Sequence, residues 1–143
     1  MEKMNSYSID QLYVGQKDHI IKTITLEDIK SFSQLTSDYH PLHFDKEYSV
    51  KNGFKDVIAH GLLLSSFSSA LIGMKLPGEK TIIMRQSFDY MVPVYPNDKL
   101  IITGTVCKVD IRFSIIEMNI TIKSNDILMS KGSYTLKIRK QDH

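Results

Sequence analysis

The sequence predicts an α+β fold in which an antiparallel sheet wraps around one long central helix. The run from Val57 to Met74 contains a single ionisable side chain, that of His60, and is long enough to form a long helix. After Gly78 the hydrophobic period changes to two, which is typical of strands. A sheet with one apolar face must cover something, and the helix at 61–75 is the one candidate long enough.

The composition favours one domain spanning residues 1–143. A net charge of +2, from 18 basic and 16 acidic residues, argues against a protein that wraps nucleic acid. The single cysteine, Cys107, excludes an intrachain disulfide, and we expect it to be a small buried residue in a strand. No apolar leader is visible, and four serines interrupt the run at 57–74, so we expect a cytoplasmic protein without a membrane partner.

In the first half, Thr25 is suited to cap a short helix that ends before the turn residues at 37–41. Residues 37–45 have no helical or strand period and are expected to form a loop, and residues 46–51 one helical turn. The central helix begins at Gly61, ends at 76–78 and is expected to be buried on nearly all sides. It has a face of larger side chains (Leu63, Phe67, Ala70, Leu71, Met74) and a face of mostly small ones (Leu62, Ser66, Ser69, Gly73).

In the second half, alternation predicts four long strands, at about 82–90, 100–106, 114–122 and 128–138. Asn125-Asp126 between the last two is a hairpin signal. The short stretch at 19–24 is a further candidate strand.

Two ionisable residues five positions apart, Asp38 and His43, lie on the proline-containing loop. A carboxylate beside an imidazole can act as an acid–base pair, because histidine titrates near neutrality and the carboxylate can orient it or a water. A capping aspartate and a surface histidine would give the same spacing.

The residues that open the central helix, His60 and Gly61, form a second candidate feature. Backbone N–H groups at a helix N-terminus can stabilise a developing oxyanion, and a glycine lets a carbonyl approach closely. A tight turn that simply needs glycine would look the same.

A metal site could be built from His40, His43, Asp45 and His60, since His-Pro-Leu-His has plausible ligand spacing. The chain has no HExxH helix and no cysteine-rich knuckle, so we expect neither a metal nor a cofactor. Without a GxSxG motif, Ser66 and Ser69 are expected to pack or to bond to the helix backbone rather than to act as nucleophiles.

These segments resemble the MaoC-like branch of the hot-dog superfamily, and most of all the short (R)-specific enoyl-CoA hydratases. Residues 38–45 read Asp-Tyr-His-Pro-Leu-His-Phe-Asp, where the family motif is Asp-x-Asn-Pro-Leu-His, a hydrophobic residue and Asp. Residues 58–64 read Ile-Ala-His-Gly-Leu-Leu-Leu, which is similar to the family's Ile-x-His-Gly and hydrophobic helix. The likeness covers nearly the whole chain.

The resemblance implies a hot-dog domain that forms a homodimer or larger homo-oligomer, with active sites at the dimer interface. It implies an acyl thioester substrate on coenzyme A or an acyl carrier protein, hydrated at a trans-2-enoyl bond or dehydrated in reverse. By this resemblance Asp38 and His43 are the catalytic pair and the N–H of Gly61 meets the thioester carbonyl. His40, His60 and Ser69 are the further substrate-binding residues.

His40 departs from the family motif, which has asparagine at that position. Two alternatives therefore stay open beside the hydratase. One is a non-catalytic module that binds acyl thioesters. The other is a thioesterase of the same fold, which the Asp38 and His43 motif disfavours.

Overall fold

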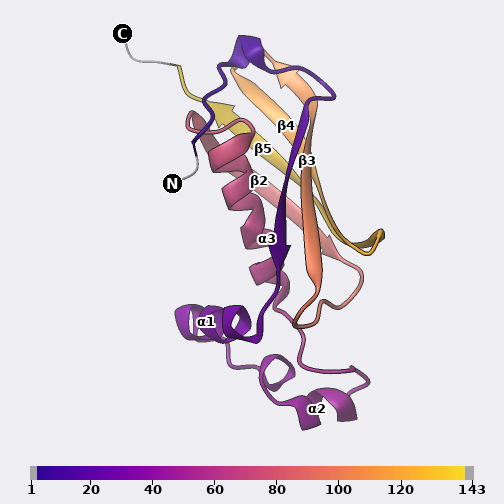
Figure 1. The fold of residues 1–143 in the computed structure, drawn as a ribbon. Helices are drawn as coiled ribbons and strands as arrows, with labels where there is room; N and C mark the ends of the chain where they lie inside the picture. The colour runs from indigo at the N-terminus through magenta and orange to yellow at the C-terminus, as the bar shows by residue number, and fades with distance from the viewer. Residues whose placement is uncertain (1–2, 141–143) are drawn as a thin grey trace.

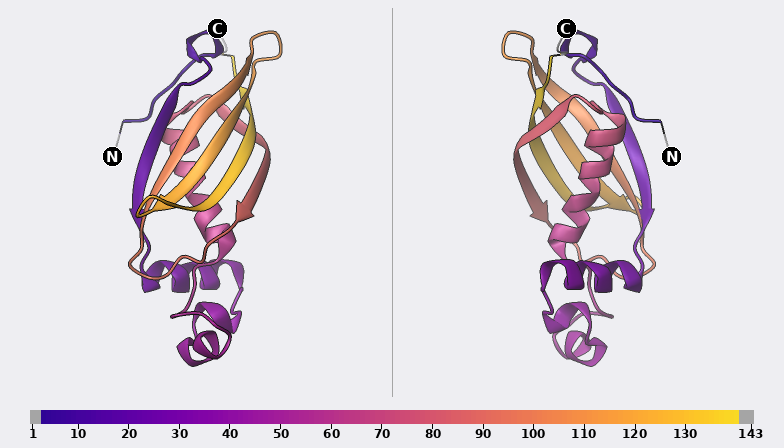
Figure 2. Two further views of the ribbon diagram at one scale, coloured as in Figure 1. Left: turned by 90° about the vertical axis from the view of Figure 1, so that its right-hand side faces the viewer. Right: turned by 90° about the vertical axis from the view of Figure 1, so that its left-hand side faces the viewer.

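A five-stranded antiparallel sheet curves around a central helix in the computed structural model, which describes residues 3–140 (Figures 1 and 2). The strand order is β1-β3-β4-β5-β2, and the helix lies on the concave side of the sheet. This is the hot-dog arrangement that the sequence predicted. The strands are β1 (Lys17–Thr23), β2 (Thr81–Tyr90), β3 (Lys99–Asp110), β4 (Ile115–Ser124) and β5 (Ile127–Ile138), and the helices are α1 (Leu26–Thr36), α2 (Lys46–Lys51) and α3 (Gly61–Ala70).

The core lies between α3 and the concave face of the sheet. Along β4 the side chains alternate, with Ile116, Met118 and Ile120 fully buried and the residues between them more exposed. They pack with Leu71 and with buried apolar residues of β3 and β5 into one hydrophobic cluster, against which Ile20 of β1 and Phe88 of β2 pack as partly buried side chains. The alternation read from the sequence therefore identified the inward face of the central strands correctly.

Local signals also fixed the connections as predicted. Thr25 caps α1, with its Oγ1 accepting from the N–H of Asp28 at 3.0 Å while the Asp28 carboxylate accepts from the N–H of Thr25 at 3.0 Å. Asn125 and Asp126 have φ angles of 49° and 62°, the left-handed values that a tight hairpin between β4 and β5 requires. The chain beyond α1 forms a 3₁₀ turn, η2 (Pro41–His43), inside the predicted loop.

The expectation that the central helix is buried on nearly all sides is wrong for the single chain. The sheet covers one side of α3, and the opposite side is open, with Leu62 64% exposed and Ser66, Ser69 and Ala70 exposed as well (Figure 2). Beyond Ala70 the helix continues as the wider π-helical segment η3 (Leu71–Lys75), in which the N–H of Leu76 donates to the carbonyl of Leu71 at 2.9 Å.

Two further features of the sheet differ from what the sequence predicted. The edge strand β2 exposes apolar side chains from successive positions, Ile82, Ile83 and Met84, so neither of its faces is fully covered. Cys107 is exposed rather than buried, because it directly follows the inward-facing Val106 and the alternation of β3 places it on the outer face. Within residues 3–140, no helix has the length and apolar character needed to cross a membrane.

Candidate active site

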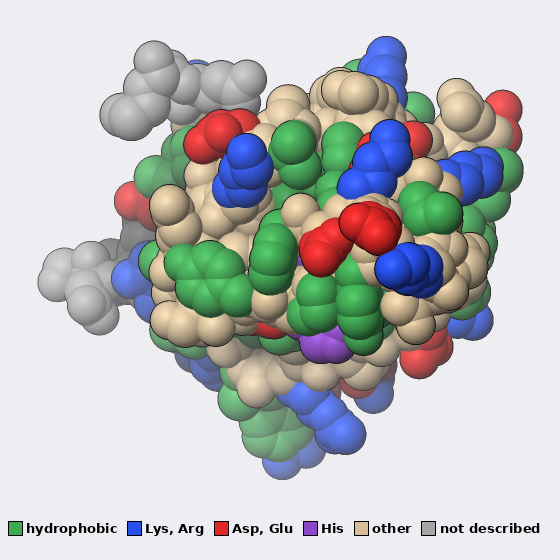
Figure 3. Space-filling model, turned by 90° about the horizontal axis from the view of Figure 1, so that it is seen from below, with side chains coloured by type: hydrophobic (Ala, Val, Ile, Leu, Met, Phe, Trp, Pro, Cys, Tyr) green, Lys and Arg blue, Asp and Glu red, His purple; other side chains and the backbone are tan. Residues whose placement is uncertain are grey.

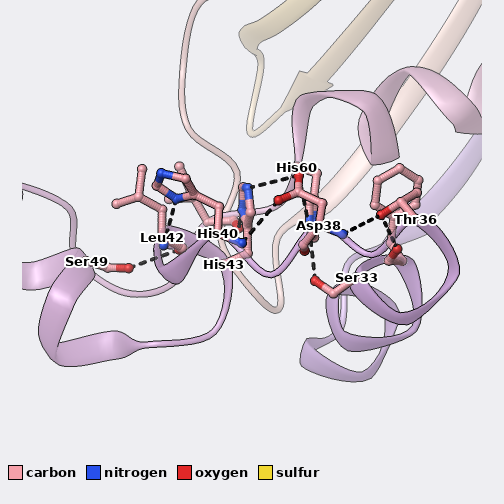
Figure 4. A network of polar contacts seen from close by, with 10 residues as sticks. Ser33, Thr36, Asp38, His40, Leu42, His43, Ser49 and His60 are labelled. Atoms are coloured by element: carbon pink, nitrogen blue, oxygen red, sulfur yellow. Dashed lines mark hydrogen bonds and ion pairs between the residues drawn. The ribbon is translucent and has the colours of Figure 1, made fainter.

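The loop between α1 and α2 carries both groups of the predicted acid–base pair. The carboxylate of Asp38 folds back on this loop, where its Oδ1 accepts a hydrogen bond of 3.1 Å from the backbone N–H of His40. The 3₁₀ turn η2 then directs His43 toward the same side of the loop. As a result, Asp38 Oδ2 lies 4.0 Å from His43 Nε2 (Figure 4). The structure therefore brings together the two side chains that the motif singled out.

A backbone carbonyl holds the ring of His43 in one tautomer. Nδ1 lies 2.7 Å from the carbonyl oxygen of Ile58, which can only accept, so Nδ1 carries the proton and Nε2 the lone pair. A water at hydrogen-bond distance from both His43 Nε2 and Asp38 Oδ2 would subtend an angle of about 90° at its oxygen. This angle is close to the one between the O–H bonds of water. The pair can therefore accept both protons of one water in hydrogen bonds.

A cavity of about 360 Å³ opens beside His43 and reaches the N-terminus of α3. Its lining includes His43, Ile58, Gly61, Leu64, Tyr90 and Pro93. Gly61 is the first residue of α3, so its N–H has no partner within the helix and lies at the positive end of the helix dipole. The ring of Tyr90 packs directly on Gly61, where a Cβ would lie 3.1 Å from Tyr90 Cζ. A methyl group here would be in tight contact with the ring, which would have to move by a few tenths of an ångström.

His60, the residue before α3, lies behind His43 and is only 3% exposed. Its Nε2 lies 3.1 Å from Ser33 Oγ and 3.4 Å from the carbonyl oxygen of Asp38. Its ring stacks on that of His43, with ring centroids 3.7 Å apart. Burial lowers the pKa of His60 from its ordinary value, and the neighbouring His43 lowers that pKa further.

The remaining predicted residues lie farther from the pair. His40 is exposed, and its Nδ1 accepts from the N–H of Leu42 at 3.3 Å, so the ring caps η2 as an asparagine side chain would. Ser69 lies on the open side of α3, about two turns beyond Gly61. Seen from below, hydrophobic side chains interspersed with charged ones cover the end of the molecule formed by α1 and α2 (Figure 3).

The chain is similar to known proteins over most of its length. A family model described as "MaoC like domain" matches residues 13–126. The chain belongs to the MaoC-like family. The MaoC-like chain is 36% identical, over 93 residues, to a protein from Aeromonas caviae named (R)-specific enoyl-CoA hydratase, covering 65% of the chain and 69% of that relative. A protein of the same name from Rhodospirillum rubrum is 39% identical over 92 residues, or 64% of each.

Other relatives carry a related name. A protein from Arabidopsis thaliana named mitochondrial 3-hydroxyacyl-[acyl-carrier-protein] dehydratase is 34% identical to the MaoC-like chain over 90 residues. That match covers 63% of the chain and 53% of the relative, so the chain spans about half of the plant protein and about two thirds of the bacterial ones.

Solved structures are similar over nearly the whole chain. The (R)-hydratase of Aeromonas caviae, described as involved in PHA biosynthesis, superposes with a TM-score of 0.86 at 29% identity, covering 90% of this chain and 98% of that one. An (R)-hydratase from Pseudomonas aeruginosa superposes with a TM-score of 0.90 at 26% identity, covering 98% of this chain and 90% of that one.

Among the described residues, one group of possible metal ligands lies at this site. Ligand atoms of Asp38, His43 and His60 all lie within 4.8 Å of one another. The planes of the two stacked imidazoles differ by only 23° and their centroids are 3.7 Å apart, so the in-plane lone pairs lie in two separate, nearly parallel planes and cannot both point at one ion. This geometry suits a water held by a carboxylate and one imidazole better than it suits a metal.

Three contributors to the MaoC-like site were not singled out from the sequence. Ile58 acts through its carbonyl. Tyr90 reaches the site from β2, 29 residues after Gly61, and Ser33 reaches it from α1, 27 residues before His60. The family motif gave a signal for the segment around Ile58. Nothing in the local pattern around Ser33 or Tyr90 distinguishes either from an ordinary packed side chain.

Proposed function

We propose that this protein is an enzyme that hydrates trans-2-enoyl thioesters to (R)-3-hydroxyacyl thioesters and catalyses the reverse dehydration. The observation that carries the proposal is the pairing of Asp38 Oδ2 with His43 Nε2 across 4.0 Å, beside a cavity that reaches the N-terminus of α3. The relatives named as hydratases and as an acyl-carrier-protein dehydratase support the same reaction class. The thioester carrier is coenzyme A or an acyl carrier protein.

The acid–base pair would activate one water. Ionised Asp38 and neutral His43 accept its two protons in hydrogen bonds, so that the water oxygen is free to attack Cβ of the alkene. One of the two groups takes a proton from that water, and with the help of the other group this same proton is delivered to Cα, so that both groups end in the protonation states in which they began. The hydroxyl and the proton therefore add to the same face of the double bond. The reverse dehydration uses the same two groups in the opposite order.

The N-terminus of α3 would stabilise the charge that this addition creates. As the water attacks Cβ, negative charge moves to the thioester oxygen. Where the cavity meets α3, the N–H of Gly61 can donate a hydrogen bond to that oxygen, and the positive end of the helix dipole can stabilise its negative charge. Loss of one such donor typically costs ~10²–10³ in rate.

We further propose that two copies of the chain associate through β2 and the open side of α3. The side chain of Asp38 is 47% exposed in the single chain, and the apolar residues Ile82, Ile83, Met84 and Leu62 are between 44% and 64% exposed. An exposed apolar edge strand is a ready template for pairing with another strand. Ser69 lies on the same side of α3, where it would meet the second copy or the substrate it binds. A cytoplasmic location remains a prediction from the sequence.

Incubation of the purified protein with crotonyl-CoA separates the three candidate functions. We expect the absorbance of the conjugated enoyl thioester to fall without release of free thiol, and chiral analysis to identify the (R)-product. Thiol release would instead indicate a thioesterase. Binding without either change would indicate a non-catalytic module.

Substitution of the pair tests the assigned residues. Asp38→Asn and His43→Ala are each expected to lower the hydration rate by at least ~10²-fold while circular dichroism shows the native fold. Asp45→Asn is the matched control, because Asp45 caps α2 from the same loop and asparagine also caps helices well. Rates close to wild type in Asp38→Asn or His43→Ala would remove that residue from the chemistry.

The variant His40→Asn tests the departure from the family motif. We expect it to retain or improve turnover, since an asparagine Oδ1 can accept from the N–H of Leu42 as His40 Nδ1 does, and the backbone N–H that orients Asp38 is unchanged. Complete loss of hydration in steady-state assays would show that the site depends on the imidazole itself.

A further inference from the structure

His60 is a buried histidine that the water-activating pair does not use. It connects separate parts of the chain, because its ring lies between Ser33 of α1, the loop that carries Asp38, and the first turn of α3 (Figure 4). Both His60 and Ser33 are only 3% exposed. His60 is not among the residues that line the cavity, so its position does not suit direct contact with a substrate there.

Two oxygens lie near Nε2 of His60, the hydroxyl of Ser33 at 3.1 Å and the carbonyl of Asp38 at 3.4 Å. The hydroxyl can donate or accept and the carbonyl can only accept, so the contacts favour the tautomer with the proton on Nε2 and the lone pair on Nδ1. Among the described residues Nδ1 is buried and has no hydrogen-bond partner. Leaving a buried acceptor unsatisfied is costly, so stability alone does not account for an imidazole at this position.

The ring of His60 also restrains the base. The hydrogen bond from Nδ1 to the carbonyl of Ile58 restrains rotation of the His43 ring. The face of the same ring stacks on His60, with ring centroids 3.7 Å apart. The ring of Phe32 packs against His60 at 4.8 Å with its plane tilted by 58°. His43 therefore has one rigid aromatic neighbour that is itself anchored by Ser33.

The charge state of His60 suits this role. Burial holds its pKa below the ordinary value, so the ring stays neutral at neutral pH. The charged and titratable groups near it are Asp38, with Oδ2 at 4.0 Å from Nε2, and His43. A neutral ring places no positive charge against His43 when that base takes up a proton.

We propose that Ser33 and His60 form a positioning pair, in which Ser33 anchors His60 and His60 holds the ring of His43 and the backbone of Asp38 in the geometry that grips the water. This inference rests on the proposed hydratase function and deepens it. It assigns His60 to alignment of the base rather than to contact with the substrate, and it adds Ser33, which has no other role in the site.

The kinetic test uses Ser33→Ala and His60→Gln in the full chain with crotonyl-CoA. Glutamine keeps an N–H donor but removes the stacked ring. We expect kcat to fall by about tenfold in Ser33→Ala and by about tenfold to a hundredfold in His60→Gln, with KM changed by less than about twofold, because small misplacements of a catalytic group are that costly. Ser130→Ala is the matched control, since it removes an equally buried hydroxyl from β5 and should leave kcat unchanged.

A second measurement follows the ring of His43 independently of turnover. In ¹⁵N NMR spectra of the histidine rings, the wild type should show His43 as the Nδ1–H tautomer. Both variants should show a mixture of tautomers, because without a fixed ring behind it His43 can move away from the carbonyl of Ile58. If kcat and the His43 tautomer are both unchanged in Ser33→Ala and His60→Gln, the positioning role is refuted. If the wild type itself hydrates no enoyl thioester, the proposed function fails, and the NMR result alone then decides whether Ser33 and His60 position His43.

Discussion

Because His60 is buried, we expect the free energy of unfolding of this protein to fall in acid, and we expect substitution of His60 to remove this part of the pH dependence. Because burial lowers the pKa of His60 in the folded state, the unfolded chain binds more protons just below the ordinary pKa of 6.5. Stability therefore falls as the pH drops below that value, until the folded state also takes up the proton. For one group the slope cannot exceed about 1.4 kcal/mol per pH unit. Against a typical total of about 5–15 kcal/mol, a drop of this size is measurable.

The assay is urea unfolding of the wild type and His60→Gln at several pH values between about 8 and 5, followed by circular dichroism. We expect the free energy of unfolding of the wild type to fall more steeply below pH 6.5 than that of His60→Gln. His19→Gln is the control, because His19 is exposed in β1 and should leave the slope as in the wild type. Equal slopes for the wild type and His60→Gln would refute the reasoning that the buried ring resists protonation.

Three other substitutions or treatments have defined outcomes. Gly61→Ala would place a methyl group 3.1 Å from the ring of Tyr90, and we expect hydration to slow by at least about tenfold with the fold retained, as measured by steady-state kinetics. Gly132→Ala would place a Cβ 2.5 Å from a backbone carbonyl oxygen of β2, and urea unfolding should show a loss of about 1–3 kcal/mol. Partial burial raises the pKa of the Cys107 thiol, so its reaction with a disulfide reagent at neutral pH should be slower than in urea, and modification should leave hydration intact because the cavity beside His43 lies elsewhere.

The parts of the fold that local physical rules determine could be predicted from the sequence. Alternation gave the inward face of β4, and the turn preference of Asn125 and Asp126 gave the hairpin, since both depend on neighbouring residues alone. Cys107 was expected to be buried because free cysteines often are, but it lies one position after the inward-facing Val106, so the alternation of β3 places it on the outer face.

The covering of the central helix could not be predicted in the same way. A hydrophobic period shows which side chains are expected to be buried, but it does not show whether the residues that bury them belong to the same chain or to a second one. Leu62 belongs to the helix that was expected to be buried on nearly all sides, and it is exposed in the single chain. The same limit applies to the site, where the motif predicted Asp38 and His43, but the contact of Ser33 with His60 joins positions 27 residues apart.

Three local structural motifs build the site, each formed by residues close together in the sequence. The site residues could therefore be predicted from the sequence, but the way the three motifs are aligned in space could not. An Asx-type turn orients Asp38, a 3₁₀ turn directs His43, and a helix N-terminus presents Gly61. Each motif has a signature within a few residues. Their mutual placement depends on long-range contacts, chiefly the bond from His43 to the carbonyl of Ile58 and the stack on His60. Because none of these contacts belongs to the cluster formed by α3 and the sheet, substitutions in them should change rate far more than they change the global fold.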